Sequence, residues 1–157
     1  MKFVKIALLV FTVIITILLA IFSFIMYSDT GSFQGASSAF FFLACTSAFS
    51  IYFHLKTAAY YPLKIFDKTI TELSKKYWAL HISFGVIMLL LGGGMILPAI
   101  KSGNSQLTQY GVYIGLGLLI FGILTLIETY KLNVFVTIYK NRRERQEEID
   151  DIGVTDE

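Results

Sequence analysis

The sequence predicts an all-α membrane protein with four transmembrane helices, and three observations support this prediction. The 157-residue chain is 55% hydrophobic and 15% charged, with a mean hydropathy of +0.68, which is too apolar for a soluble domain of this length. Its charges are segregated, because residues 64–76 and the segment after residue 140 carry most of them. Lysine and arginine also fall almost entirely on one side of a four-span arrangement.

Each span is predicted from an apolar run of about 20 residues, the length that a helix needs to cross a hydrocarbon core. We place the spans at residues 6–27, 36–55, 77–100 and 110–130. The first run is longer than a typical signal-peptide core of about 7 to 15 residues, and no clear small-x-small cleavage site follows it. We therefore expect it to be a retained anchor.

Orientation follows from the positive residues, which are held on the cytoplasmic side during insertion. Of the 13 lysine and arginine residues, Lys101 alone falls on the outer side of the four-span arrangement. This bias predicts cytoplasmic N- and C-termini. We expect a multi-pass protein of the bacterial inner (plasma) membrane with two short outer loops, 28–35 and 101–109, and a cytoplasmic loop between spans two and three.

Two cytoplasmic helical features are predicted in addition to the spans. Apolar residues recur at helical spacing through residues 63–77 with charged residues between them, which is typical of an amphipathic helix lying on the inner interface. Beyond span four the apolar pattern continues through residues 132–139. We therefore expect the fourth helix to extend past the membrane, where its apolar surface needs a cover.

Small residues in spans three and four predict close helix packing, since lipid-embedded helices associate through backbone approach at such positions. The two spans should form a tight antiparallel hairpin, although the same small faces could instead serve a homodimer or a partner. The glycines that carry this prediction are Gly85, Gly92, Gly111, Gly115 and Gly122. In span one, by contrast, Thr12 and Thr16 are expected to bond to carbonyls one turn earlier.

A candidate polar cluster is predicted at the cytoplasmic interface from His54, His81, Glu128 and Lys131. Antiparallel spans bring these residues to a similar depth, and ionisable groups at membrane depth are candidates for function. In the simplest interpretation Glu128 pairs with Lys131 one turn away. A proton, ion or headgroup site is one alternative, and axial ligation of haem by the two histidines is another.

Several function classes lack their sequence signatures. The single cysteine, Cys45, builds neither a disulfide framework nor a cysteine metal site. No HExxH, phosphate-binding loop or plausible nucleophile with a His and an acid is present. The net charge of +2 is too small and too localised to indicate nucleic acid. We therefore expect no enzyme activity, no catalytic residue, no cofactor, no metal and no nucleic-acid partner.

The tail, residues 140–157, changes from basic to acidic. Its basic part should contact anionic lipid headgroups or a partner, and Arg143 can pair with Glu147 one turn later. The acidic end should point into the cytoplasm, either as a solvated helix or as a docking segment. The basic residues are Lys140, Arg142, Arg143 and Arg145.

The layout resembles an uncharacterised bacterial family of small four-helix inner-membrane proteins, known as a domain of unknown function. The residues that carry the resemblance are LKIFDKTITELSKKYWAL (63–80), LIETYKL near the end of span four, and the charged RRERQEEID that follows. The longer fourth helix and the strongly charged tail depart from that family. The resemblance implies the four-span fold and brings no activity or functional residue.

These observations together predict a single four-helix transmembrane domain, residues 1–157, followed in its last part by the charged tail. Because catalytic signatures are absent and an extended helix and glycine faces are present, we expect an accessory or scaffold subunit of a larger membrane complex. Its partners would be membrane lipids and either a membrane protein or further copies of the chain. A small oligomeric transporter or channel and a haem-binding electron-transfer subunit are the alternatives.

Overall fold

The computed structural model describes residues 2–63, 70, 73–101 and 105–153, and its regular elements are four α-helices. The helices are α1 (Lys2–Thr30), α2 (Ala36–Ala58), α3 (Lys75–Lys101) and α4 (Ser105–Gly153). Each is long and apolar enough to cross a bilayer. The predicted all-α class with four candidate spans is therefore confirmed, and the fold is that of a multi-pass membrane protein.

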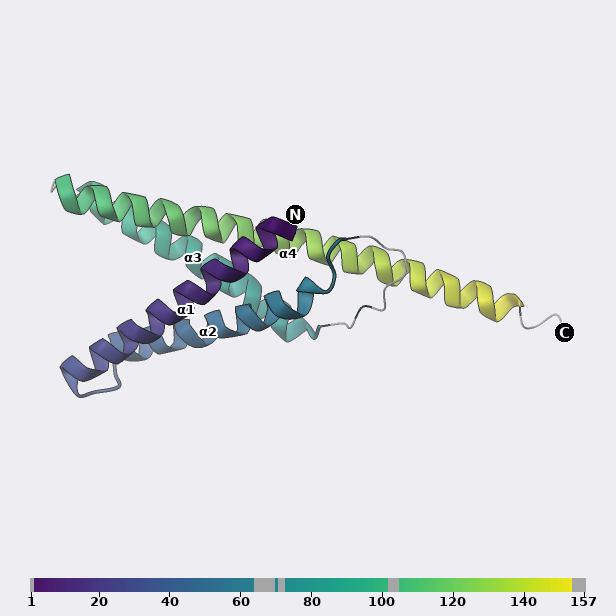
Figure 1. Ribbon diagram of the computed structural model, residues 1–157, viewed down its shortest axis with the longest axis horizontal. Helices are drawn as coiled ribbons and strands as arrows, with labels where there is room; N and C mark the ends of the chain where they lie inside the picture. Colours follow the sequence, from purple (N-terminus) through teal and green to yellow (C-terminus); the bar gives the residue numbers. More distant parts are fainter. Residues whose placement is uncertain (1, 64–69, 71–72, 102–104, 154–157) are drawn as a thin grey trace.

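The fourth helix is much longer than a bilayer requires. It has 49 residues, which corresponds to about 70 Å at the rise of an α-helix. Figure 1 shows its C-terminal half projecting well beyond the other three helices. The helix therefore continues well past residue 130, where the predicted fourth span ends. The amphipathic helix expected at 63–77 falls largely on residues 64–69, 71 and 72, which lie outside the described residues.

Helices α1 and α2 form a hairpin joined by a short loop in which Gly31 and Gly35 both have φ of 61°, a backbone conformation that glycine adopts without steric cost. Hydroxyl groups connect the two helices. Thr16 Oγ1 lies 2.6 Å from Ser47 Oγ, and Ser23 Oγ donates to the carbonyl of Ser37 at 2.9 Å. Such bonds between small polar side chains stabilise helix pairs where no water competes.

The threonines of α1 also bond within their own helix. Thr12 Oγ1 donates to the Leu8 carbonyl and Thr16 Oγ1 to the Thr12 carbonyl, both at 2.7 Å. The predicted bonding one turn back is therefore confirmed. The Thr16 hydroxyl also lies within hydrogen-bond distance of Ser47 Oγ, so Thr16 contributes to the contact between α1 and α2 as well.

Helices α3 and α4 form a second hairpin whose backbones are in direct contact. A Cβ atom built on Gly92 would lie 2.7 Å from the carbonyl oxygen of Gly115, and one on Gly122 would lie 2.9 Å from that of Gly85. At Gly111 the Cβ would meet Ala99 Cβ at 2.7 Å. The glycines singled out in the sequence thus lie at this intramolecular interface, where a side chain would force the helices apart.

The two hairpins meet at one end and diverge at the other, as Figure 1 shows. They meet where the start of α1 crosses α4 and where the end of α2 approaches the start of α3. Two clusters of buried apolar residues occupy this junction. The loop-side apolar cluster comprises Leu8, Phe84, Met88 and Phe121, and the tail-side apolar cluster comprises Phe53, Tyr60, Tyr61, Leu132 and Phe135.

The helices are largely unburied away from that junction. Helix α1 is the least buried of the four candidate spans, and its Phe24 side chain is 70% exposed. Exposed apolar surface of this kind suits lipid or another transmembrane helix. The junction is therefore where side chains from all four helices are buried together, and it contains the buried ionisable side chains.

Candidate polar site

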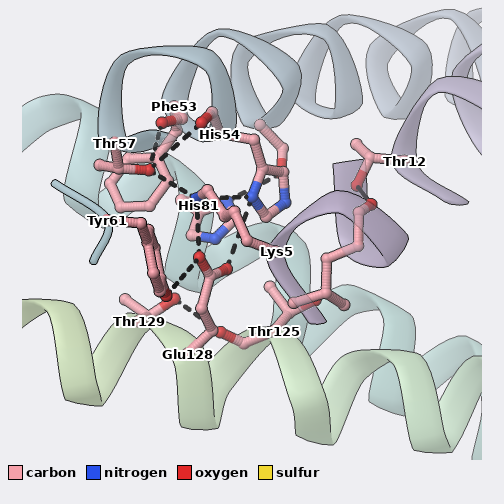
Figure 2. Close-up of polar contacts among 12 residues, drawn as sticks. Lys5, Thr12, Phe53, His54, Thr57, Tyr61, His81, Thr125, Glu128 and Thr129 are labelled. Atoms are coloured by element: carbon pink, nitrogen blue, oxygen red, sulfur yellow. Dashed lines mark hydrogen bonds and ion pairs between the residues drawn. The ribbon is translucent and has the colours of Figure 1, made fainter. Parts of the chain in front are cut away.

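One ionisable side chain from each helix lies between the two apolar clusters, and we call these four residues the polar cluster. They are Lys5 of α1, His54 of α2, His81 of α3 and Glu128 of α4, with exposed fractions of 4%, 0%, 0% and 5%. Figure 2 shows them converging from their separate helices. Burial of four such groups inside an apolar bundle is costly unless they pair with one another.

The Lys5 ammonium group lies at the centre of these contacts. Its Nζ is 2.7 Å from Glu128 Oε1 and 2.9 Å from His54 Nδ1, and it also donates to Thr57 Oγ1. An ammonium group has three hydrogens and no acceptor, so these contacts use all its donors. His54 consequently accepts at Nδ1 and carries its ring hydrogen on Nε2. The ammonium is thus a cation held by three converging acceptors.

His81 is oriented by neighbours on two sides. Its Nδ1 lies 2.7 Å from Ser50 Oγ, and its ring stacks on Phe53 with centroids 4.1 Å apart and planes at 16°. The His54 ring meets it edge-on, at 4.8 Å and 87°. These contacts hold the His81 ring between Phe53 and His54.

Three buried atoms of this cluster have no hydrogen-bond partner among the described residues: His54 Nε2, His81 Nε2 and Glu128 Oε2. Buried polar atoms are satisfied in the great majority of proteins, so each exception needs an explanation. One ligand atom from each of these residues lies within 4.8 Å of the others. Since His54 Nε2 carries the ring hydrogen, the free acceptors are His81 Nε2 and Glu128 Oε2, and they add acceptor capacity beyond what Lys5 uses.

Tyr61 closes the cluster on the tail side. Its hydroxyl donates to Glu128 Oε1 at 3.4 Å, a long contact. Burial, and then the charge of Glu128, raise the pKa of the Tyr61 hydroxyl above its ordinary value. The hydroxyl therefore stays protonated and remains a donor to the carboxylate. An open cavity of about 200 Å³, lined in part by Tyr61, Val4 and Lys131, reaches Glu128 from the surface.

Three of the four residues predicted for this site, His54, His81 and Glu128, lie together in the structure. The fourth, Lys131, is not part of the polar cluster, and its predicted pairing with Glu128 is wrong. Lys131 is exposed at the mouth of the cavity, and Glu128 pairs with Lys5 rather than with Lys131. The reason is geometric, since the start of α1 crosses α4 on the face that carries Glu128. An ammonium buried there loses its water, and only a buried counter-charge compensates for that loss.

Lys5 was expected only to contribute to membrane orientation, and its place in the polar cluster was not predicted. A signal was present, because Lys5, Thr12 and Thr16 recur at intervals of seven and four residues and so lie on one face of a helix. Ser50, His54 and Thr57 recur at intervals of four and three residues and so share one face of α2. Tyr61 was not among the residues predicted for the site. Polar residues at helical spacing inside apolar spans predict helix contacts, and these two stripes do face each other.

The basic residues of the tail are separate from this site. Lys140, Arg142, Arg143 and Arg145 lie on the projecting part of α4, where they are exposed. Arg143 Nε lies 2.8 Å from Glu147 Oε1, so the predicted pair one turn apart is confirmed. Both side chains are mostly exposed, and the pair stabilises the helix by at most about 0.5 kcal/mol.

The polar cluster suits the binding of a cation. Two imidazoles and a carboxylate can supply lone pairs to a metal or a proton. A haem does not fit between the two imidazoles as they lie, because the rings touch edge to face and Phe53 covers the other face of His81. The structure therefore gives the haem hypothesis no support.

No protein-family model, curated protein or solved structure matches the chain. The fold and the site together define a multi-pass helical protein in which two hairpins meet around a buried ionisable cluster.

Proposed function

We propose that this protein is a non-enzymatic accessory or scaffold subunit of a larger membrane complex. The observation that carries the proposal is the divergence of its two hairpins (Figure 1). Away from the junction each hairpin exposes long apolar faces, and Gly94 and Gly117 are exposed positions where an added Cβ would meet nothing within 4 Å. Small exposed residues let a further helix approach closely.

The projecting part of α4 supports the same proposal. It continues for about seven turns beyond the polar cluster and keeps exposed apolar side chains among its charges, including Val134, Ile138 and Ile149. Apolar residues on a helix outside the bilayer favour contact with another protein. The groove of about 480 Å³ beside this segment, which Trp78 and Tyr130 help to line, adds a further surface for such a contact.

The proposed orientation places both termini in the cytoplasm and the protein in a bacterial inner membrane. The one-sided distribution of lysine and arginine supports it. The polar cluster then lies near the cytoplasmic edge of the membrane, and its role in a subunit of this kind is to hold the two hairpins at a fixed angle. A buried ion pair can specify one arrangement of helices even where it adds little stability.

Site-specific photo-crosslinking in the native host tests this proposal. A benzophenone amino acid replaces Phe24, which is 70% exposed, and in a matched control replaces Phe84, which is fully buried. We expect the Phe24 position to give an adduct with a different protein, identified by mass spectrometry, and the Phe84 position to give none. A stable monomer in mild detergent with no adduct from Phe24 would contradict the proposal.

A second candidate function is a small oligomeric cation transporter, in which the polar cluster would line a cytoplasmic vestibule. The observation that favours it is the placement of ionisable groups between two apolar clusters, an arrangement that shields a bound ion on both sides. Proton or cation flux into liposomes should then fall in Glu128→Gln and persist in the exposed control Glu147→Gln. Lack of flux from a verified oligomer would count against transport.

A further inference from the structure

The Lys5 ammonium marks a position where the protein already binds a cation. Glu128 Oε1 and His54 Nδ1 contact it at 2.7 and 2.9 Å. These two acceptors are a carboxylate oxygen and an imidazole nitrogen, which are also ligand types for divalent metal ions. The lone pairs that hold the ammonium are therefore those that a metal would use.

His81 supplies a third ligand that Lys5 does not use. Its Nε2 is fully buried and lacks a partner among the described residues, as does Glu128 Oε2. Ligand atoms of His54, His81 and Glu128 lie within 4.8 Å of one another. Ligand atoms about 2.1 Å from a tetrahedral metal lie about 3.4 Å apart, so the most widely separated pair would need to approach by up to about 1.4 Å.

We propose that His54, His81 and Glu128 form a binding site for a first-row divalent transition metal such as Zn²⁺, and that the Lys5 ammonium is a tethered competitor for that site. Metal enters as the ammonium withdraws, so one positive centre replaces another and the Glu128 carboxylate remains neutralised. This inference does not depend on whether the chain has a protein partner.

The surroundings of His81 and Glu128 match those of metal ligands. Metal-bound histidines donate their second ring nitrogen to an oxygen acceptor, which fixes the ring. Ser50 Oγ lies 2.7 Å from His81 Nδ1 and provides that acceptor. Tyr61 contacts the ligating carboxylate in the same outer position. The cavity of about 200 Å³ that reaches Glu128 supplies an entry path.

Two nitrogen ligands and one carboxylate favour Zn²⁺, Co²⁺ or Ni²⁺ over Mg²⁺ and Ca²⁺, which prefer sites built wholly of oxygen. Co²⁺ is a useful probe because its visible absorption bands report low-coordinate nitrogen and oxygen ligation. We would purify the full chain in mild detergent, remove the affinity tag and residual metal, titrate with Co²⁺, and measure Zn²⁺ affinity by competition against a chromophoric chelator.

Four variants distinguish this site from loose binding. His81→Gln and Glu128→Gln should weaken Zn²⁺ binding by at least about tenfold. Lys5→Met should strengthen it by at least about tenfold, because the competitor is removed while an unbranched side chain of similar length is kept. The matched control is Lys2→Met, on the same helix but exposed, and its affinity should equal that of the unmodified protein.

Three outcomes would overturn the proposal: no Co²⁺ bands in either the unmodified protein or Lys5→Met, unchanged affinity in His81→Gln, or an affinity of Lys5→Met no higher than that of the unmodified protein. Binding that appears only in Lys5→Met supports the competition. If Lys5→Met does not fold, the comparison of His81→Gln with the unmodified protein decides. Loss of the Co²⁺ absorption bands in His81→Gln supports the site, and their retention overturns it.

Discussion

Lys5 Nζ lies 2.7 Å from Glu128 Oε1, and this ion pair joins the first helix to the fourth inside the junction of the two hairpins. Both side chains are at least 95% buried. Neither charge has bulk water to stabilise it, so each depends on the other and on the hydroxyl and imidazole groups around it. The angle between the hairpins is coupled to this contact, because it forms only where α1 crosses α4.

Glu128→Gln should destabilise the protein strongly. The substitution leaves the Lys5 ammonium buried without a counter-charge, which costs about 3 to 5 kcal/mol when one partner of a buried pair is removed. Thermal unfolding in detergent, followed by Trp78 fluorescence, measures the effect. Glu147→Gln is the control, because Glu147 is mostly exposed, and its stability should change by about 0.5 kcal/mol or less.

Removal of both charges should recover much of that loss. In Lys5→Met with Glu128→Leu neither an unpaired ammonium nor an unpaired carboxylate is buried, and apolar replacement of a buried pair is often neutral or stabilising. A double-mutant cycle over the two single variants and the double variant should give a coupling free energy of about 2 kcal/mol or more. Additive effects of the two substitutions would show that the pair is not energetically coupled.

Gly115→Ala should weaken the contact between α3 and α4. Its Cβ would lie 2.6 Å from Ile96 Cγ1 and 2.7 Å from the Gly92 carbonyl oxygen, so the helices must separate, at a cost of about 1 to 3 kcal/mol. Gly117→Ala is the matched control on the same helix, since nothing lies within 4 Å of its Cβ. That control should be neutral or slightly more stable, because alanine favours helix. Equal stability of the two variants would contradict tight packing at Gly115.

Labelling of single cysteines tests the orientation. After Cys45→Ala, a cysteine is placed at Ser32 in the loop of the first hairpin or at Lys140 on the projecting part of α4. A membrane-impermeant maleimide applied to intact cells should label the Ser32 position, and the Lys140 position should react only after the membrane is opened. The reverse pattern would invert the proposed topology.

The four helices, the length of α4 and the glycines at which helices approach closely were all predictable from the sequence. Lipid allows only hydrogen-bonded helices of a certain length, so an uncharged apolar run is enough to predict a span. Close packing there needs small residues, so Gly92 and Gly115 were identifiable without coordinates. The similar depth of His54, His81 and Glu128 also follows from antiparallel spans of known rise.

Which cation pairs with Glu128 follows only from the packing of the helices. From the sequence Lys131 was the near neighbour, one turn away, whereas Lys5 lay at the other end of the chain and resembled an orientation signal. The choice depends on how α1 rotates about its axis and where it crosses α4, and both result from side-chain packing across the junction rather than from any local propensity. A long-range contact of this kind forms because burial of Leu8 and Phe121 in one cluster carries Lys5 to the carboxylate.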